Sequence, residues 1–173
     1  MTTALPPESP ESVSAGQKTG ISVAEIPREQ RVAALLLSRY NLRYLVRLYA
    51  AFEGDLLLPI VLGEVAMYNV SGLLPDDPAT LAASFCDDPN HIPLRPCNAF
   101  SISSSTGIPR ETVRRKVSHL IQQGWIDRDT RGGLTITPKA VALCLKPFHE
   151  DNQSDFLATA DRVWAALGAP RHA

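Results

Sequence analysis

The chain has 173 residues, of which 45% are hydrophobic and 20% charged, and its formal net charge at pH 7 is −1. This composition fits one compact globular domain with polar tails. No apolar run is long enough to cross a membrane, and the N-terminus lacks the basic and apolar segments of a secretion signal, so we expect a cytoplasmic protein without membrane contact. The three cysteines, Cys86, Cys97 and Cys144, are odd in number and irregularly spaced, which argues against a disulfide framework.

The first part of the chain divides into a leader and a long helix. Residues 1–27 contain several prolines among small and polar residues and predict a disordered leader. Residues 28–54 predict a helix with an arginine row at Arg39, Arg43 and Arg47. Its apolar residues at near-helical spacing are Leu35, Leu42, Leu45, Val46, Tyr49 and Phe52. Two interpretations stay open: the helix packs against a partner subunit, or it is a core helix with a partly exposed arginine edge.

A second, strongly apolar helix follows, with Asp55 as its capping residue and its end near Val70, and we expect it to be buried. Glu64 and Tyr68 lie one turn apart on it, either as a polar pair in the core or exposed. Residues 74–97 then predict a surface excursion rich in proline and aspartate. The excursion holds residue types that bind metals, namely Cys86, Asp87, Asp88, His91 and Cys97. Their spacing matches no compact motif, so we expect neither a metal nor a cofactor.

Residues 98–124 predict a short polar helix, a Gly-Ile-Pro turn and a second helix at about 109–123. Pro109 suits the first turn of that helix because its missing N–H costs nothing there, and Gly124 suits a left-handed cap. One apolar stripe along the helix comprises Val113, Val117, Leu120 and Ile121. The remaining faces carry Arg110, Glu111, Thr112, Arg114, Arg115, Lys116, Ser118, His119 and Gln122. Polar and cationic groups on an exposed helix face suit the major groove of DNA, although a solvated amphipathic helix is the simpler alternative.

Residues 125–137 predict a β-hairpin wing. Two runs rich in β-branched and aromatic residues flank a turn with Gly132 and Gly133, and glycines supply the backbone conformations that hairpin turns need. Arg128 and Arg131 lie at or near the tip, where they can contact the DNA backbone or a narrow minor groove.

The C-terminal part, residues 140–173, predicts two further helices. Thr137 caps and Pro138 opens the first, which we expect to end at about Leu145 because Lys146 and Pro147 follow. After a polar break, Ser154 can cap the last helix. Its apolar stripe comprises Phe156, Leu157, Ala160, Val163, Trp164 and Leu167.

Charge is segregated along the chain. Residues 98–139 carry seven Lys and Arg against three Asp and Glu, a net charge of +4, so the remainder of the chain carries −5. The near-neutral total therefore conceals a basic segment joined to an acidic body. A local positive charge is what steers a protein towards a polyanion.

The run SSSTGIPRETVRRKV from Ser103 to Val117, followed by Leu120 and the tripeptide Gly-Trp-Ile at 124–126, resembles bacterial winged helix-turn-helix regulators of the MarR, GntR and IclR kind. The resemblance implies a mainly α fold with a small β-hairpin wing and a DNA-binding domain over residues 55–139. It also implies a homodimer held by helices outside that domain, here residues 28–54 and 140–173. It identifies no small-molecule effector, although regulators of this kind can have one.

We therefore expect a transcriptional regulator that binds double-stranded DNA sequence-specifically. The expected DNA contacts are Ser103, Ser105, Arg110, Glu111, Thr112, Arg114, Arg115, Lys116, His119, Arg128 and Arg131. Among these, Glu111, Thr112, Arg115 and His119 should lie nearest the bases. An enzyme is disfavoured because no nucleophile turn, phosphate-cradling glycine loop or paired histidine and acid is present. The closer alternative is a winged helix that binds another protein and no DNA, but such a module would show apolar residues where this helix has arginines.

Overall fold

The computed structural model describes residues 25–71, 94–144 and 146–168, and all side chains in these ranges except those of residues 143–150. The chain is mainly helical with one small antiparallel hairpin. Its helices are α1 (Arg28–Ala51), α2 (Leu57–Val70), α4 (Ala99–Thr106), α5 (Arg110–Gln122), α6 (Pro138–Cys144) and α7 (Lys146–Leu167), and its strands are β1 (Ile126–Arg128) and β2 (Leu134–Ile136). The predicted leader up to residue 24, and Cys86, Asp87, Asp88 and His91, lie outside the described residues.

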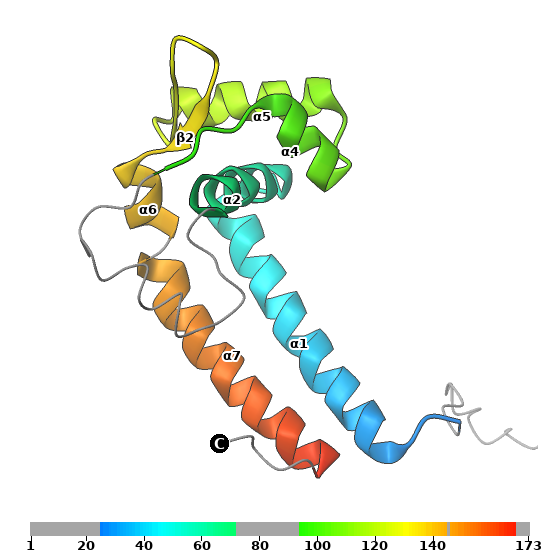
Figure 1. Cartoon of the computed structure of the whole chain (residues 1–173). Coiled ribbons are helices and arrows are strands. Elements are labelled where there is room, and N and C mark those ends of the chain that lie inside the picture. The colour runs from blue at the N-terminus through cyan, green and yellow to red at the C-terminus, as the bar shows by residue number, and fades with distance from the viewer. Residues whose placement is uncertain (1–24, 72–93, 145, 169–173) are drawn as a thin grey trace, which may run out of the picture.

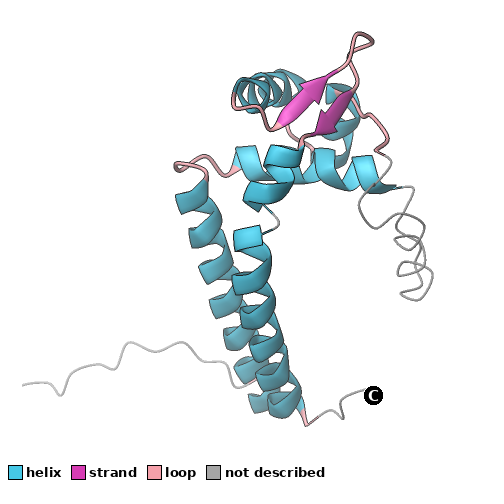
Figure 2. Cartoon of the chain, turned by 90° about the vertical axis from the view of Figure 1, so that its left-hand side faces the viewer, coloured by secondary structure: helices cyan, strands magenta, loops and turns pink. Residues whose placement is uncertain are grey.

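The elements form a body and an arm (Figure 1). Helices α2, α4 and α5 pack together with the hairpin to form the body. Helices α1 and α7 leave it side by side and run antiparallel, α1 towards the body and α7 away from it, as a second view also shows (Figure 2). No helix in the described ranges is long and apolar enough to cross a membrane.

The core of the body lies between α2, α5 and the hairpin. In the predicted stripe of α5, Val113, Val117 and Leu120 are fully inaccessible to solvent and Ile121 is half-buried against the core. Gly124 closes the helix in the left-handed conformation at φ 70°. Burial of this apolar surface is the main term that holds the body together. The other core residues are Phe52, Leu58, Val61, Leu62, Val65, Cys97, Ile102, Ile126, Leu134 and Ala140.

Asn69, near the end of α2, is a buried polar centre that the sequence did not predict. Its Nδ2 donates to the carbonyls of Arg95 (2.7 Å) and Leu134 (3.0 Å), and its Oδ1 accepts from the backbone N–H of Ile136 (2.8 Å). One side chain thus joins α2 to β2 and to the segment before α4. Glu64 and Tyr68, the two predicted candidates for this role, are only half-buried.

The end of the predicted surface excursion belongs to the core. Cys97 is buried and exchanges two backbone hydrogen bonds with Leu134, at 3.1 and 2.8 Å, so that it extends the hairpin by an isolated β-bridge. The prediction placed residues 74–97 entirely at the surface and is wrong at Cys97. A single paired residue leaves no strand-length pattern in the sequence, which is why alternation could not reveal it.

The C-terminal helix starts earlier than predicted. Instead of a polar break after residue 147 and a cap at Ser154, α7 is continuous from Lys146 to Leu167. Pro147 is the second residue of α7, where the first N–H groups have no intrahelical partner, so a proline is tolerated there. It opens α7 and does not merely end the preceding helix. The predicted cap of that preceding helix is present, since Thr137 Oγ1 accepts from the N–H of Ala140 at 3.2 Å.

Candidate nucleic-acid interface

The outer face of α5 gathers most of the predicted site residues. Val113 and Val117 fix the rotation of the helix by entering the core, which turns the opposite side to solvent. That side forms a shallow depression lined by Glu111, Arg114, Arg115, Ser118, His119 and Gln122. These side chains extend over three turns of one helix face. Thr112, which was expected beside the bases, is half-buried at the edge of this face.

Helix α4 contributes less than expected. Asn98 Oδ1 caps it by accepting from the N–H groups of Phe100 (2.9 Å) and Ser101 (3.0 Å). The Ser103 hydroxyl donates to the Ile108 carbonyl at 2.7 Å, and Ser105 donates back to the Ser101 carbonyl at 3.1 Å. Both hydroxyls, which were predicted to contact DNA, therefore stabilise α4 and the turn after it in the free chain.

Arg110, the first residue of α5, lies over the ring of Phe100, with its guanidinium carbon 5.9 Å from the ring centroid. Phe100 is 63% exposed at the start of α4. The contact holds a cation at the junction of the two helices. Phe100 was absent from the predicted site because an isolated aromatic residue in a polar segment carries no periodic signal.

Arg114 and Arg115 are sequence neighbours in different surroundings. Arg114 Nη1 lies 3.5 Å from Glu111 Oε2, and both side chains are well exposed. An exposed pair of this kind is worth little, so either partner can exchange it for another contact. Arg115 projects into the depression with His119, one turn further along.

Lys116 was expected to contact DNA, but the structure places it in an ion pair within the chain. Its ammonium group forms an ion pair with Asp55, which lies between α1 and α2, and its side chain is 18% exposed. Asp55 also accepts from the N–H of Leu57 at 3.1 Å. Burial raises the pKa of the Asp55 carboxyl, but the hydrogen bond and charge of Lys116, with the backbone N–H groups of Leu57 and Leu58, outweigh this effect and hold the pKa below its ordinary value. Lys116 is therefore engaged within the chain and does not extend the outer face.

The hairpin turn presents exposed cations on an ordered loop. Asp129 Oδ1 accepts from the N–H groups of Arg131 (2.8 Å) and Gly133 (2.7 Å), so that carboxylate organises the loop backbone. Arg128, at the end of β1, and Arg131, in the loop, are both exposed as predicted. Their side chains are therefore available to a polyanion.

No group of three or more metal-ligating side chains occurs among the described residues. The Cys97 thiol is buried beside the Leu134 carbonyl, with sulfur to oxygen at 3.8 Å. Burial raises its pKa to about 11, and the Glu64 carboxylate adds to the effect. Cys97 is consequently a protonated core residue at neutral pH, with little of the thiolate character that metal binding or nucleophilic attack requires.

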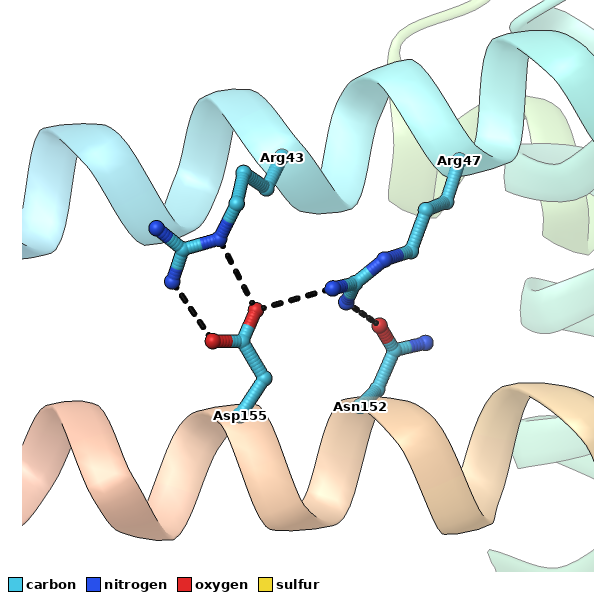
Figure 3. A network of polar contacts seen from close by, with 4 residues as sticks. All are labelled: Arg43, Arg47, Asn152 and Asp155. Carbon is cyan, nitrogen blue, oxygen red and sulfur yellow. Dashed lines mark hydrogen bonds and ion pairs between the residues drawn. The ribbon is translucent and has the colours of Figure 1, made fainter.

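The arm is held together by polar contacts between α1 and α7 (Figure 3). Asp155 accepts from Arg43 Nε (3.1 Å) and Nη2 (2.5 Å) and from Arg47 Nη2 (3.1 Å). Arg47 Nη1 also donates to Asn152 Oδ1 at 2.6 Å. The hydrogen bond from Arg43 is the largest cause that lowers the pKa of the Asp155 carboxyl, and it outweighs burial. Two members of the arginine row of α1, Arg43 and Arg47, thus face α7, whereas Arg39 is exposed.

Comparisons with protein-family models, with curated proteins and with solved structures found no match to this chain.

Proposed function

We propose that the protein is a cytoplasmic, homodimeric transcriptional regulator that binds double-stranded DNA sequence-specifically through a winged helix-turn-helix. In this proposal α4 and α5 are the two helices of the motif, α5 enters the major groove, and the β1–β2 hairpin is the wing. The observation that carries the proposal is the outer face of α5. Six polar or charged side chains share one exposed surface there, while the opposite side of the same helix is buried.

The chemistry of that face fits base edges. Arg115 can bond guanine through two parallel hydrogen bonds, Gln122 can do the same with adenine, and Glu111 can accept from cytosine. A major groove about 12 Å wide admits one helix, so these groups can reach bases only from the exposed side of α5. A solvated helix does not need such different polar groups aligned over three turns.

The basic groups around α5 supply the phosphate contacts. Arg110 lies beside the outer face, Arg114 lies on it, and Arg131 lies in the exposed hairpin loop. Lys116 is excluded from this set because it is paired with Asp55. In a dimer three arginines per subunit would neutralise about six phosphates, which predicts a slope of log K against log salt of roughly −5.

The test is selection from random duplex DNA with the full chain, followed by titration of the selected sequence at several salt concentrations. The proposal predicts one enriched DNA sequence and a slope of log K against log salt of roughly −5. The Arg131→Ala change should flatten the slope by roughly 2, one contact for each subunit, and leave the enriched sequence unchanged. A chain that binds no duplex at low salt would overturn the proposal and favour a module that binds another protein.

The proposed homodimer is supported by the exposed apolar face of α1 in the arm. Leu35, Leu42, Val46 and Tyr49 lie within about 60° of one another around α1 at 100° per residue, on a face about 90° from Arg43 and about 130° from Arg47. All four are more than half exposed, while Ala33 is the one buried residue of α1. Leu35, Leu42 and Tyr49 are seven residues apart, the spacing of a seam between two helices. A second copy of α1 carries the same seam, so two copies can pack against each other along it.

Two matched variants test this contact. Leu42→Glu combined with Val46→Glu places two carboxylates in the seam and should yield monomers in analytical ultracentrifugation. Asn41→Glu adds a carboxylate at an exposed position of α1 to the side of the seam and should leave the dimer intact. A dimer that survives the double change would show that α1 does not form the contact.

A further inference from the structure

The corner between α1 and α2 is a rigid joint with an unusual backbone. Glu53 and Gly54 are both left-handed, at φ 51° and 89°, and Glu53 is the only described residue other than glycine with a positive φ. The N–H of Gly54 donates to the Tyr49 carbonyl at 2.8 Å, and the N–H of Asp55 donates to the Phe52 carbonyl at 2.9 Å. A non-glycine residue keeps this conformation only where its surroundings fix it. The direction in which α1 leaves the body is therefore defined.

Two contacts tie this corner to α5. At the C-terminal end of α5, the ring of Phe52 meets the ring of Trp125 edge-on, with centroids 5.3 Å apart and an interplanar angle of 85°. In the middle of α5, Lys116 pairs with Asp55. Lys116 precedes the last residue of α5 by six positions, which is about 9 Å along the axis. One contact would let α5 pivot about it, whereas two contacts separated along the helix fix its direction relative to α1.

We propose that Asp55 and Lys116 are positioning residues that set the angle between the arm and α5, and thereby the spacing of the two DNA half-sites that a dimer accepts. This inference rests on the proposed function. In a two-fold dimer joined through α1, the separation of the two α5 helices depends on the angle each makes with its own arm. A dimer of this type accepts half-sites separated by a defined number of base pairs.

The experiment uses the charge-removing variants Asp55→Asn and Lys116→Met. Asparagine can still accept from the N–H of Leu57, and methionine keeps the aliphatic length of lysine. Each variant and the wild type are used to select from random duplex DNA. Each protein is then titrated against the sequence that the wild type enriches, and against the same sequence with its half-sites moved apart by two base pairs.

We expect the wild type to enrich one spacing and both variants to enrich a broader range. The ratio of affinities for the original and the widened sequence should fall by about threefold to fivefold in each variant, the upper part of the range for an ion pair with partial exposure. The double variant should fall no further than either single variant, because each change removes the same pair.

The sign of the two effects separates positioning from direct contact. If Lys116 touched phosphate, Lys116→Met would weaken binding to both DNAs while Asp55→Asn would strengthen it, since the latter removes a negative charge. A positioning role predicts the same loss of spacing preference from both. Lys139→Met removes another lysine of the same basic segment, whose ammonium group donates to the Gln123 carbonyl at 2.7 Å and makes no contact with Asp55. It controls for charge and should leave the spacing preference unchanged.

Opposite effects of the two variants, or an unchanged spacing preference in both, would overturn this inference and leave the proposed function intact. A wild type that enriches a sequence word with no preferred spacing would overturn it too. A wild type that binds no duplex would instead overturn the proposed function, and the inference with it.

Discussion

Arg114 and Arg115 offer a matched pair for assigning roles on α5. Both line the depression, but Arg115 points almost directly away from the buried stripe of α5, whereas Arg114 lies about 90° from that direction and beside Glu111. We expect Arg115→Ala to reduce discrimination between the selected sequence and random duplex by about 1–3 kcal/mol, the value of a bidentate contact to guanine. Arg114→Ala should weaken binding to both DNAs alike. Fluorescence anisotropy titrations at one salt concentration measure, for each variant, the ratio of its affinities for the selected sequence and for random duplex. Equal ratios for the two variants would place Arg115 on phosphate.

At the residue scale, the burial and exposure of side chains on α5 could be predicted from the sequence, because they depend on local helical periodicity. The burial of Val113 and Val117 and the exposure of Arg115 follow from one helical repeat. The pairing of Lys116 with Asp55 joins residues 61 positions apart, and Asn69 bonds residues as far as 67 positions away. Helical spacing carries no information about such partners, because they depend on how the helices are arranged in space.

At the scale of the element, the polar contact between α1 and α7 should be sensitive to acid. Because the pKa of Asp155 is lowered in the folded chain, its ionised form contributes stability at every pH above the ordinary value of about 4. That contribution is lost as the pH falls through the lower pKa of the folded state. We expect Asp155→Asn to be less stable than the wild type at neutral pH and to lose less stability between about pH 5 and pH 2.

Urea unfolding followed by circular dichroism over that pH range measures the difference. Asp151→Asn is the control, because it removes a carboxylate from an exposed position on α7 without touching the pair with Arg43. Parallel pH profiles for Asp155→Asn and the wild type would show that the contact contributes nothing to stability.

The start of α7 and the hairpin show two limits of predicting elements from sequence. Both strands were located closely because β-branched residues and glycines mark them. The start of α7 was misplaced because a proline can either follow one helix or open the next. Pro147 does both, since it lies three residues after Cys144, the end of α6, and one residue after Lys146, the start of α7. Only the path of the chain decides between these roles.

At the scale of the whole molecule, the body and the arm carry different exposed surfaces. The basic groups proposed to contact DNA lie on α5 and the hairpin, and most of the exposed leucines lie on α1. Of the two interpretations of α1 left open by its sequence, a core helix is contradicted by the exposure of Leu35 and Leu42. An apolar stripe predicts that a helix packs against another surface, but it does not say whether that surface belongs to the same chain.

The outward leucines of α1 have a consequence for how the protein behaves at different abundances. If a second copy covers them, association and folding are linked, and each tenfold dilution should remove about 1.4 kcal/mol of stability per dimer. The melting temperature measured by calorimetry should therefore rise with protein concentration, and in Leu42→Glu with Val46→Glu it should not. A wild-type melting temperature independent of concentration would contradict this linkage. Where the linkage holds, the protein is its own stabilising ligand, and its copy number in the cell sets the folded fraction as well as the number of molecules.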